Sequence, residues 1–270
     1  MARTVWYPGH MARGGRKLAE LIEKLDLIIE VRDARAPFST SSPLLAKFKK
    51  IRPVLSVLSK SDLADPDITK LWLDKLENSY AVNLKQDKGV SKLKRDLLAR
   101  KPAHRELRLA VMGIPNVGKS MLLNALAGKA QAQVGGIPGV TRSVSWYKNN
   151  GLLIVDSPGI LDPHSEPGVH QALSWLGCAR ADILTGGFEA AALELINYLN
   201  SKNLLNKVLS KWDLDLNNFN LNASYEILDL IGRRLGCLIS GGAVNTELAG
   251  KRFLDAFASG KLTPVSLETP

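Results

Sequence analysis

The chain has 270 residues, of which 45% are hydrophobic and 23% charged, an ordinary composition for a globular protein. It contains no apolar run near the roughly 18 residues that a membrane-spanning helix needs, so we expect no membrane protein. The N-terminal residues lack the features of a signal peptide or an organelle presequence, which predicts a cytoplasmic protein. The two cysteines, Cys178 and Cys237, match no metal-ligand spacing, and we expect reduced, buried thiols.

Basic residues are unevenly distributed along the chain, which carries a formal net charge of +10. Residues 1–110 hold 23 Lys and Arg against 13 Asp and Glu, whereas residues 111–270 hold 13 of each kind. A polyanionic partner such as RNA explains this excess, because each neutralised phosphate releases counterions. A basic face that is merely solvated is the alternative.

Short apolar, β-branched runs alternate with helical patterns as far as Val155, which is typical of an α/β fold with a mainly parallel sheet. The runs that predict strands are Leu25 to Val31, Pro53 to Leu58, Tyr80 to Val82, Leu107 to Met112, Ser143 to Tyr147 and Leu152 to Val155. The patterns that predict helices are Arg16 to Lys24, Asp67 to Glu77, Val90 to Arg100 and Lys119 to Ala127. We expect these helices to cover both faces of the sheet.

The pattern changes beyond Gly168, where apolar residues recur at three and four spacing without strand-like alternation. This spacing predicts helices over Ala190 to Leu199, Ser224 to Leu235 and Glu247 to Ala258. We therefore expect two domains, an α/β domain over residues 1–177 and a small all-α domain over residues 178–270.

A phosphate-binding loop is the strongest motif of the chain. Gly113-Ile-Pro-Asn-Val-Gly-Lys-Ser120 lies between a predicted strand and a predicted helix, which is the context that this motif requires. Its glycines let the backbone curl, so that successive N–H groups and the helix N-terminus face the phosphates. Lys119 then reaches the terminal phosphates, and the hydroxyl of Ser120 binds Mg²⁺.

Two further segments fit the phosphate end of such a site. Asp156-Ser-Pro-Gly159 follows a buried-type strand, so Asp156 can hold the magnesium shell while the Gly159 N–H meets the γ-phosphate. The glycine-rich segment from Gly135 to Arg142 contains Thr141, which could close on the metal when the γ-phosphate is present. We expect Mg²⁺ to be bound by Ser120, Thr141 and Asp156.

Two segments of the form Leu-Ser-Lys-x-Asp-Leu compete for the role of guanine reader, Leu58 to Leu63 and Leu209 to Leu214. In such a motif the aspartate accepts both guanine N–H donors and the lysine stem covers the ring, whereas adenine offers no matching pair of donors. The usual order of GTPase motifs favours the second segment. The strand-like run Pro53 to Leu58 favours the first, and we give local structure more weight than order.

The segment Asn83-Leu84 follows the first reader after a further predicted strand, where a base-contacting loop is expected, and nothing similar follows Asp213. The motif order is then guanine reader, base loop, phosphate loop, threonine loop and metal aspartate. This order is a circular permutation of the usual one, which leaves the sheet contacts intact. The predicted fold is a circularly permuted P-loop GTPase domain followed by a small all-α domain.

Five stretches of the sequence carry a family resemblance: Trp6 to Ala12, Glu30 to Pro37, Gly113 to Ser120, Gly236 to Asn245 and Leu267 to Pro270. With them the chain resembles, over essentially its whole length, the bacterial ribosome biogenesis GTPase A family, the YlqF type of circularly permuted GTPases. The resemblance implies a factor that acts late in assembly of the large (50S) ribosomal subunit. It further implies binding to ribosomal RNA (rRNA) and ribosomal proteins, and slow GTP hydrolysis that the ribosomal particle stimulates.

The chain departs from the pattern of that family at three places. Ser59 stands where the family usually has Asn, which shortens the contacts of the amide with guanine and with the neighbouring loop. Met121 stands where a threonine is usual, with little expected effect because Ser120 binds Mg²⁺. The residues Asn83-Leu84 match the base-loop pattern of the family only loosely.

The group that orients the attacking water is not evident from the usual motif. Small GTPases place a glutamine where this chain has Ile160, and an aliphatic side chain can neither donate nor accept a hydrogen bond. The resemblance assigns a catalytic role to His10, and contact with RNA or capping of the first helix is the alternative for this residue. Asn116 matches the asparagine with which similar GTPases hold K⁺ against the phosphates.

We therefore expect a monomeric GTPase that binds GTP and GDP, with His10, Lys119 and Thr141 contributing to catalysis. The expected nucleotide contacts are Ser59, Lys60, Ser61, Asp62, Asn83, Leu84, Asn116, Val117, Gly118, Lys119, Ser120, Met121 and Gly159. Two alternatives are a nucleotide-binding RNA scaffold with negligible turnover and a metabolic or transport P-loop ATPase, against which the Lys60/Asp62 pair argues.

Overall fold

The chain divides into two compact units in a computed structural model, which describes residues 22–42, 45–128, 145–156, 166–181, 186–214, 216 and 223–270. The first unit comprises Met1–Ser165 together with Ser266–Pro270, and the second comprises Glu166–Val265. The division after residue 165 precedes the boundary expected at 177, and the last five residues return to the first unit.

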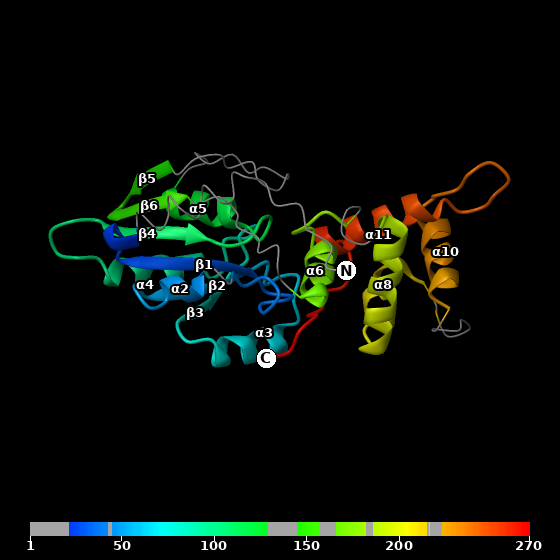
Figure 1. The fold of residues 1–270 in the computed structure, drawn as a ribbon, viewed down its shortest axis with the longest axis horizontal. Helices are drawn as coiled ribbons and strands as arrows, with labels where there is room; N and C mark the ends of the chain where they lie inside the picture. The colour runs from blue at the N-terminus through cyan, green and yellow to red at the C-terminus, as the bar shows by residue number, and fades with distance from the viewer. Residues whose placement is uncertain are drawn as a thin grey trace. The chain divides into compact units, whose positions relative to one another are not determined.

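The first unit is built on a six-stranded sheet with the order β3-β2-β1-β4-β6-β5 (Figure 1). The strands are β1 (Leu27–Asp33), β2 (Val54–Ser59), β3 (Ser79–Ala81), β4 (Leu107–Met112), β5 (Ser145–Asn149) and β6 (Leu152–Asp156). All neighbouring pairs are parallel except β5 and β6, which are antiparallel. The predicted α/β class with a mainly parallel sheet is therefore confirmed.

The strand order brings motifs from distant parts of the chain together at the carboxyl ends of the strands. β4 lies between β1, the first strand of the described chain, and β6, which follows β5 in sequence. The order runs from β1 through β2 to β3 on one side and from β4 through β6 to β5 on the other, so the two central strands form a topological switch point. The carboxyl ends of β1, β2, β4 and β6 meet there.

The described helices of the first unit are α2 (Leu45–Phe48), α3 (Pro66–Lys75), α4 (Val90–Ala99) and α5 (Lys119–Ala127), preceded by the 3₁₀ turn η1 (Ile22–Lys24). The predicted helix from Arg16 falls mostly outside the described residues, and α2 was not predicted because its one turn is too short to show a period. Asp65 caps α3, since its side chain accepts the N–H of Asp67, and Pro66 starts the helix.

The sheet is covered on both faces, which explains why its strands are apolar without alternation. On one face Leu45 and Phe48 of α2 pack with Ile28, Ala110 and Met112, and Trp72 of α3 packs with Leu58. The register that pairs Ile28 with Val54 places Leu58 on this same face. The alternate residues Leu109, Val111 and Ile154 are fully buried on the other side, where α5 contacts β4 and β6.

The second unit is helical over its described residues. Its helices are α6 (Pro167–Trp175), α8 (Phe188–Ser201), α9 (Leu205–Leu209), α10 (Ser224–Arg234) and α11 (Thr246–Ser259), with the 3₁₀ turn η2 (Ser210–Trp212). α11 contacts α6, α8 and α10, and the Glu247 carboxylate on α11 accepts the N–H groups of Phe188 and Glu189 at 2.9 Å each. Cys178 and Cys237 are both buried and form no disulfide, as expected. None of the described helices is long and apolar enough to cross a membrane.

Candidate nucleotide-binding site

The phosphate loop joins β4 to α5 at the carboxyl edge of the sheet, as its motif predicts. Gly113 has φ +150°, and a Cβ atom built on it would lie 2.5 Å from the Val31 carbonyl oxygen, so only glycine lets the loop pass this close to β1. Gly118 has φ +101° and caps α5 without a side-chain hydrogen bond. The first N–H groups of α5 therefore have no capping side chain, which is the arrangement that binds phosphate.

Lys119 is folded back over this loop. Its side chain is only 7% exposed, and Nζ donates a hydrogen bond of 2.8 Å to the Ile114 carbonyl oxygen. Asn116 has φ 59° and is half-buried in the same loop. Ser120 and Met121 lie in the first turn of α5 and are also half-buried. The ammonium group is thus held at the loop that would receive the phosphates.

Asp156 ends β6 and pairs in the sheet with Val111, one residue before the end of β4. It is 3% exposed, and its Oδ1 atom is buried without a hydrogen-bond partner among the described residues. Burial raises the pKa of this carboxyl from 3.8 to about 6, and the charge of Lys119 offsets only part of the effect. A buried carboxylate oxygen without a donor is costly, and a bound cation would remove that cost.

The guanine reader expected at Ser59 to Asp62 follows β2 directly. Ser59 is fully buried, and its hydroxyl lies within hydrogen-bonding distance of two carbonyl oxygens, that of Arg32 at 3.0 Å and that of Val117. A hydroxyl has one proton, so it donates to one of them at a time. Serine at this position therefore still reaches the phosphate loop, although it is shorter than asparagine.

Lys60 and Asp62 occupy different surroundings within the reader. Lys60 has φ 54°, which is uncommon for a residue with a side chain, and its Nζ lies 2.9 Å from Oδ2 of Asp33. The N–H of Ser61 donates to the Val82 carbonyl at 3.2 Å, which ties the turn to the end of β3. Asp62 is exposed, so its carboxylate is accessible to a ligand.

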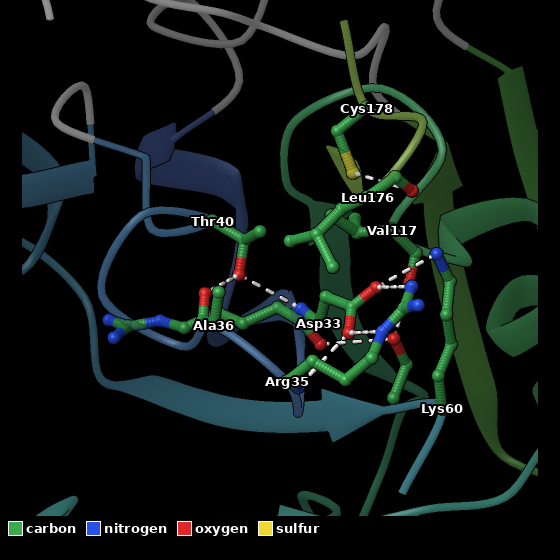
Figure 2. A network of polar contacts seen from close by, with 10 residues as sticks. Asp33, Arg35, Ala36, Thr40, Lys60, Val117, Leu176 and Cys178 are labelled. Atoms are coloured by element: carbon green, nitrogen blue, oxygen red, sulfur yellow. Dashed lines mark hydrogen bonds and ion pairs between the residues drawn. The ribbon is translucent and has the colours of Figure 1, made fainter. Parts of the chain in front are cut away.

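Asp33 is a site residue that the sequence did not single out. It ends β1, is fully buried, and accepts hydrogen bonds from Nε of Arg35 at 3.0 Å and Nη2 of Arg35 at 2.8 Å (Figure 2). Burial alone would raise its pKa, but the charges and hydrogen bonds of Arg35 and Lys60 hold the pKa well below its usual range. The Arg-Asp-Ala-Arg run at a strand end was a usable signal, because it places charges where a buried strand stops.

The base loop at Asn83 and Leu84 lies next to the phosphate loop. Oδ1 of Asn83 accepts the N–H groups of Lys85 at 3.0 Å and Gln86 at 3.2 Å, so this side chain shapes its own turn. A Cβ atom on Gly118 would lie 3.5 Å from both Leu84 Cδ1 and Ser59 Oγ. The reader, the base loop and the phosphate loop therefore converge at Gly118.

The competing segment, Leu209 to Leu214, lies in the helical unit. Ser210 begins η2 immediately after α9, and Asp213 ends this turn with φ 55°. Of the two candidate readers, only Leu58 to Leu63 follows a strand of the sheet. His10, Thr141 and Gly159, which we expected at the site, and Ile160 lie outside the described residues.

The strand order and the convergence of these loops define the class of the protein: it is a P-loop GTPase whose motif order is circularly permuted, with the reader strand β2 and the base loop preceding the phosphate loop. A family model described as a 50S ribosome-binding GTPase matches residues 108–216, a region that begins in the strand before the phosphate loop.

The full-length relatives define the family more narrowly. The chain is 31% identical to ribosome biogenesis GTPase A of Bacillus pumilus, with 98% of each chain covered. It is 30% identical to the protein of the same name from Thermotoga maritima, covering 98% of this chain and 94% of that one. Among solved structures it is similar to GDP-bound TM YlqF, with a TM-score of 0.68, 25% identity and coverage of 94% and 99%. The chain belongs to the ribosome biogenesis GTPase A family, and it binds and hydrolyses GTP.

Proposed function

We propose that this GTPase is an assembly factor for the large (50S) ribosomal subunit that binds rRNA and ribosomal proteins in its GTP form and leaves after hydrolysis. The observation that carries the nucleotide part is the convergence of reader and phosphate loop, where the Ser59 hydroxyl reaches the Val117 carbonyl. The family match supports the ribosomal part. We expect the protein to act as a cytoplasmic monomer.

The described loops fit the parts of a guanine nucleotide. The N–H groups at the start of α5 face the phosphates, with Lys119 on the terminal ones. Asp62 accepts the two guanine N–H donors, and the stem of Lys60 covers the ring while Asp33 holds its ammonium group. The remaining contacts come from loop residues on either side, Ser61, Asn83, Leu84, Asn116, Val117, Gly118, Met121 and Gly159.

The residues at the phosphate end fit Mg²⁺. Asp156 presents a buried oxygen without a hydrogen-bond partner, and Ser120 stands in the first turn of α5, as in other phosphate loops. No cluster of three or more His, Cys, Asp or Glu occurs among the described residues, so phosphate oxygens and water would complete the coordination. Mg²⁺ would neutralise charge on the phosphates, with Thr141 as a third protein ligand, and Asn116 would hold K⁺.

Hydrolysis requires a group that positions water at the γ-phosphate. Lys119 stabilises the charge that develops on the phosphate oxygens, and His10 is our candidate for orienting the water, because Ile160 cannot do so. We expect a low basal rate that the ribosomal particle increases. If His10→Ala leaves the stimulated turnover unchanged, this role is excluded; equal rates in K⁺ and Na⁺ exclude the K⁺ site.

A basic hollow at the amino ends of the strands, opposite the nucleotide site, supports RNA binding. Lys24, Arg52, Arg105 and Arg108 line a space of about 390 Å³ beside the starts of β1, β2 and β4, with Glu23 and Asp26 as the acidic residues. Lys47, Lys49 and Lys50 are exposed on the segment that leads to Arg52. Because the nucleotide site lies at the carboxyl ends of these strands, a phosphate backbone can bind here without blocking it.

Co-sedimentation with large ribosomal subunits in GTP, GDP and a non-hydrolysable analogue tests the proposal. We expect the protein in the pellet with GTP and the analogue and much less with GDP. Association that ignores the nucleotide contradicts the proposal. Multiple-turnover kinetics with the subunit distinguishes this proposal from the alternative of an RNA scaffold with negligible turnover. The scaffold would show no steady-state release of phosphate.

A further inference from the structure

The last five residues of the chain, Ser266–Pro270, return to the first unit after the helical unit ends at Val265. We call this segment the C-terminal strap. Although its contacts span 196 residues or more of sequence, it forms hydrogen bonds with the two segments that lie on either side of the guanine reader: the loop from Ala34 to Ser39 after β1, and α3 with its cap residue.

Glu268 fixes the loop after β1. Its carboxylate accepts the N–H of Phe38 at 2.7 Å and the N–H of Ser39 at 3.0 Å. The N–H of Leu267, which is buried, donates to the Arg35 carbonyl at 2.7 Å. Two consecutive strap residues thus bind three backbone groups of one loop, and a carboxylate that accepts N–H donors makes the stronger kind of hydrogen bond.

The strap also contacts α3, at its cap residue and in its second half. Ser266 Oγ accepts the N–H of Asp65, the cap residue of that helix, at 3.1 Å. The Glu268 carbonyl accepts Nε1 of Trp72 at 3.2 Å. Trp72 packs in turn with Leu58 and Ala64, which lie immediately before and shortly after the reader. Both ends of the reader turn are therefore held by groups that the strap contacts.

A continuous set of contacts leads from the strap to Lys60. Arg35, whose carbonyl binds the strap, places its guanidinium on Asp33, and Asp33 binds Lys60 at 2.9 Å. The N–H of Ala34 donates to the Ser59 carbonyl at 2.9 Å, which fixes the same loop to the reader.

We propose that the C-terminal strap is a positioning element for the guanine reader: by holding the loop after β1 and the start of α3, it sets the preference of Lys60 and Asp62 for guanine. This inference rests on the proposed role of Ser59 to Asp62 as reader. The strap directly follows the helical unit in sequence. Because it holds the segments beside the reader, a displacement of its five residues would lower guanine selectivity.

The test compares GDP with inosine diphosphate, which lacks the 2-amino donor that Asp62 accepts. The ratio of the two affinities, measured by displacement of a fluorescent GDP, reports the geometry of the reader and does not change if a variant is merely less folded. We expect the ratio to fall roughly three- to tenfold in Glu268→Ala and in a chain lacking residues 266–270, the range that one hydrogen bond controls.

Two further variants complete the experiment. Glu268→Gln keeps an acceptor oxygen and should restore most of the ratio, while Thr269→Ala, at an exposed strap residue, should match the wild type. If the wild type prefers GDP and Glu268→Ala shows the same ratio, the strap is not a positioning element. If the wild type itself shows no preference for GDP, the proposed reader is wrong and this inference fails with it.

Discussion

Two aspartates at the same edge of the sheet, Asp33 and Asp156, have opposite surroundings. They end β1 and β6, the strands on either side of β4, and both are buried. Asp33 is bound by Arg35 and Lys60, which keep its pKa low, whereas Asp156 has an oxygen without a hydrogen-bond partner and a pKa raised to about 6.

The difference shows that the two halves of the site are prepared in different ways. The base-reading half is electrostatically complete without nucleotide, because protein cations already neutralise its buried carboxylate. The phosphate half carries a carboxylate, Asp156, whose buried charge is destabilising at neutral pH and would be compensated by an added cation. If the proposed roles hold, we expect guanine recognition to be built into the folded chain and metal binding to be coupled to the arrival of the phosphates.

The largest expected effect follows from removing the charge of Asp33. Asp33→Asn leaves the buried Arg35 and the partly exposed Lys60 beside a neutral group, and we expect the free energy of unfolding to fall by about 3–5 kcal/mol at pH 7.5. The folded-state pKa lies below the unfolded value, so this contribution is present at neutral pH and is lost as the pH falls below about 4. Urea unfolding at several pH values measures it; a loss that persists undiminished at acid pH would contradict the assignment.

Replacing the charge of Asp62 tests the reading half directly. Asp62→Asn removes the acceptor for both guanine N–H donors, so we expect GDP affinity to fall by about 3 kcal/mol, roughly a hundredfold, and xanthosine diphosphate to become the better ligand. Asp74→Asn, an exposed change on α3, is the matched control. Unaltered GDP preference in Asp62→Asn would show that the base is read elsewhere.

The same substitution at Asp156 should change stability in the opposite direction. The folded-state pKa of about 6 lies above the unfolded value of 3.8, so the nucleotide-free protein loses stability as the pH rises between them. Asp156→Asn should therefore raise the free energy of unfolding by about 2–3 kcal/mol at pH 7.5 and have no effect below about pH 4.

The variant Asp156→Asn also tests whether Asp156 binds Mg²⁺. In the presence of GDP, Mg²⁺ should stabilise the wild type further and should add little to Asp156→Asn. Thermal unfolding with and without Mg²⁺ measures both effects in one series. Stabilisation of Asp156→Asn by Mg²⁺ equal to that of the wild type would remove Asp156 from the metal site.

The smallest expected effect concerns the link between the two halves. Ser59→Ala removes the hydroxyl that reaches Val117 and Arg32, and we expect GDP affinity to fall by about 1 kcal/mol, roughly fivefold. Because the hydroxyl of Ser59 braces the phosphate loop, the affinity for inosine diphosphate should fall by the same factor, unlike in the strap variants. Ser91→Ala, at an exposed position of α4, is the control in equilibrium titrations.

The sequence by itself determined the class of fold, the order of the motifs and the residues of the phosphate loop. Each depends on local patterns: apolar runs for buried strands, helical spacing for the second unit, and glycines at Gly113 and Gly118 where φ is positive. The choice of Leu58 to Leu63 as reader also came from a local signal, the strand that precedes it.

Only the tertiary structure decided how these motifs are held. The sequence placed a signature over Glu30 to Pro37 but gave Asp33 no role, because its partner Lys60 lies 27 residues on, at the end of the parallel strand β2. The return of Glu268 to Phe38 and Ser39 was likewise invisible, since no period or motif marks a contact across the whole chain. Asp33 and Asp156 are both buried, and they differ because Arg35 and Lys60 bind the first. Which cations reach a buried aspartate is a property of the packed sheet and not of the aspartate.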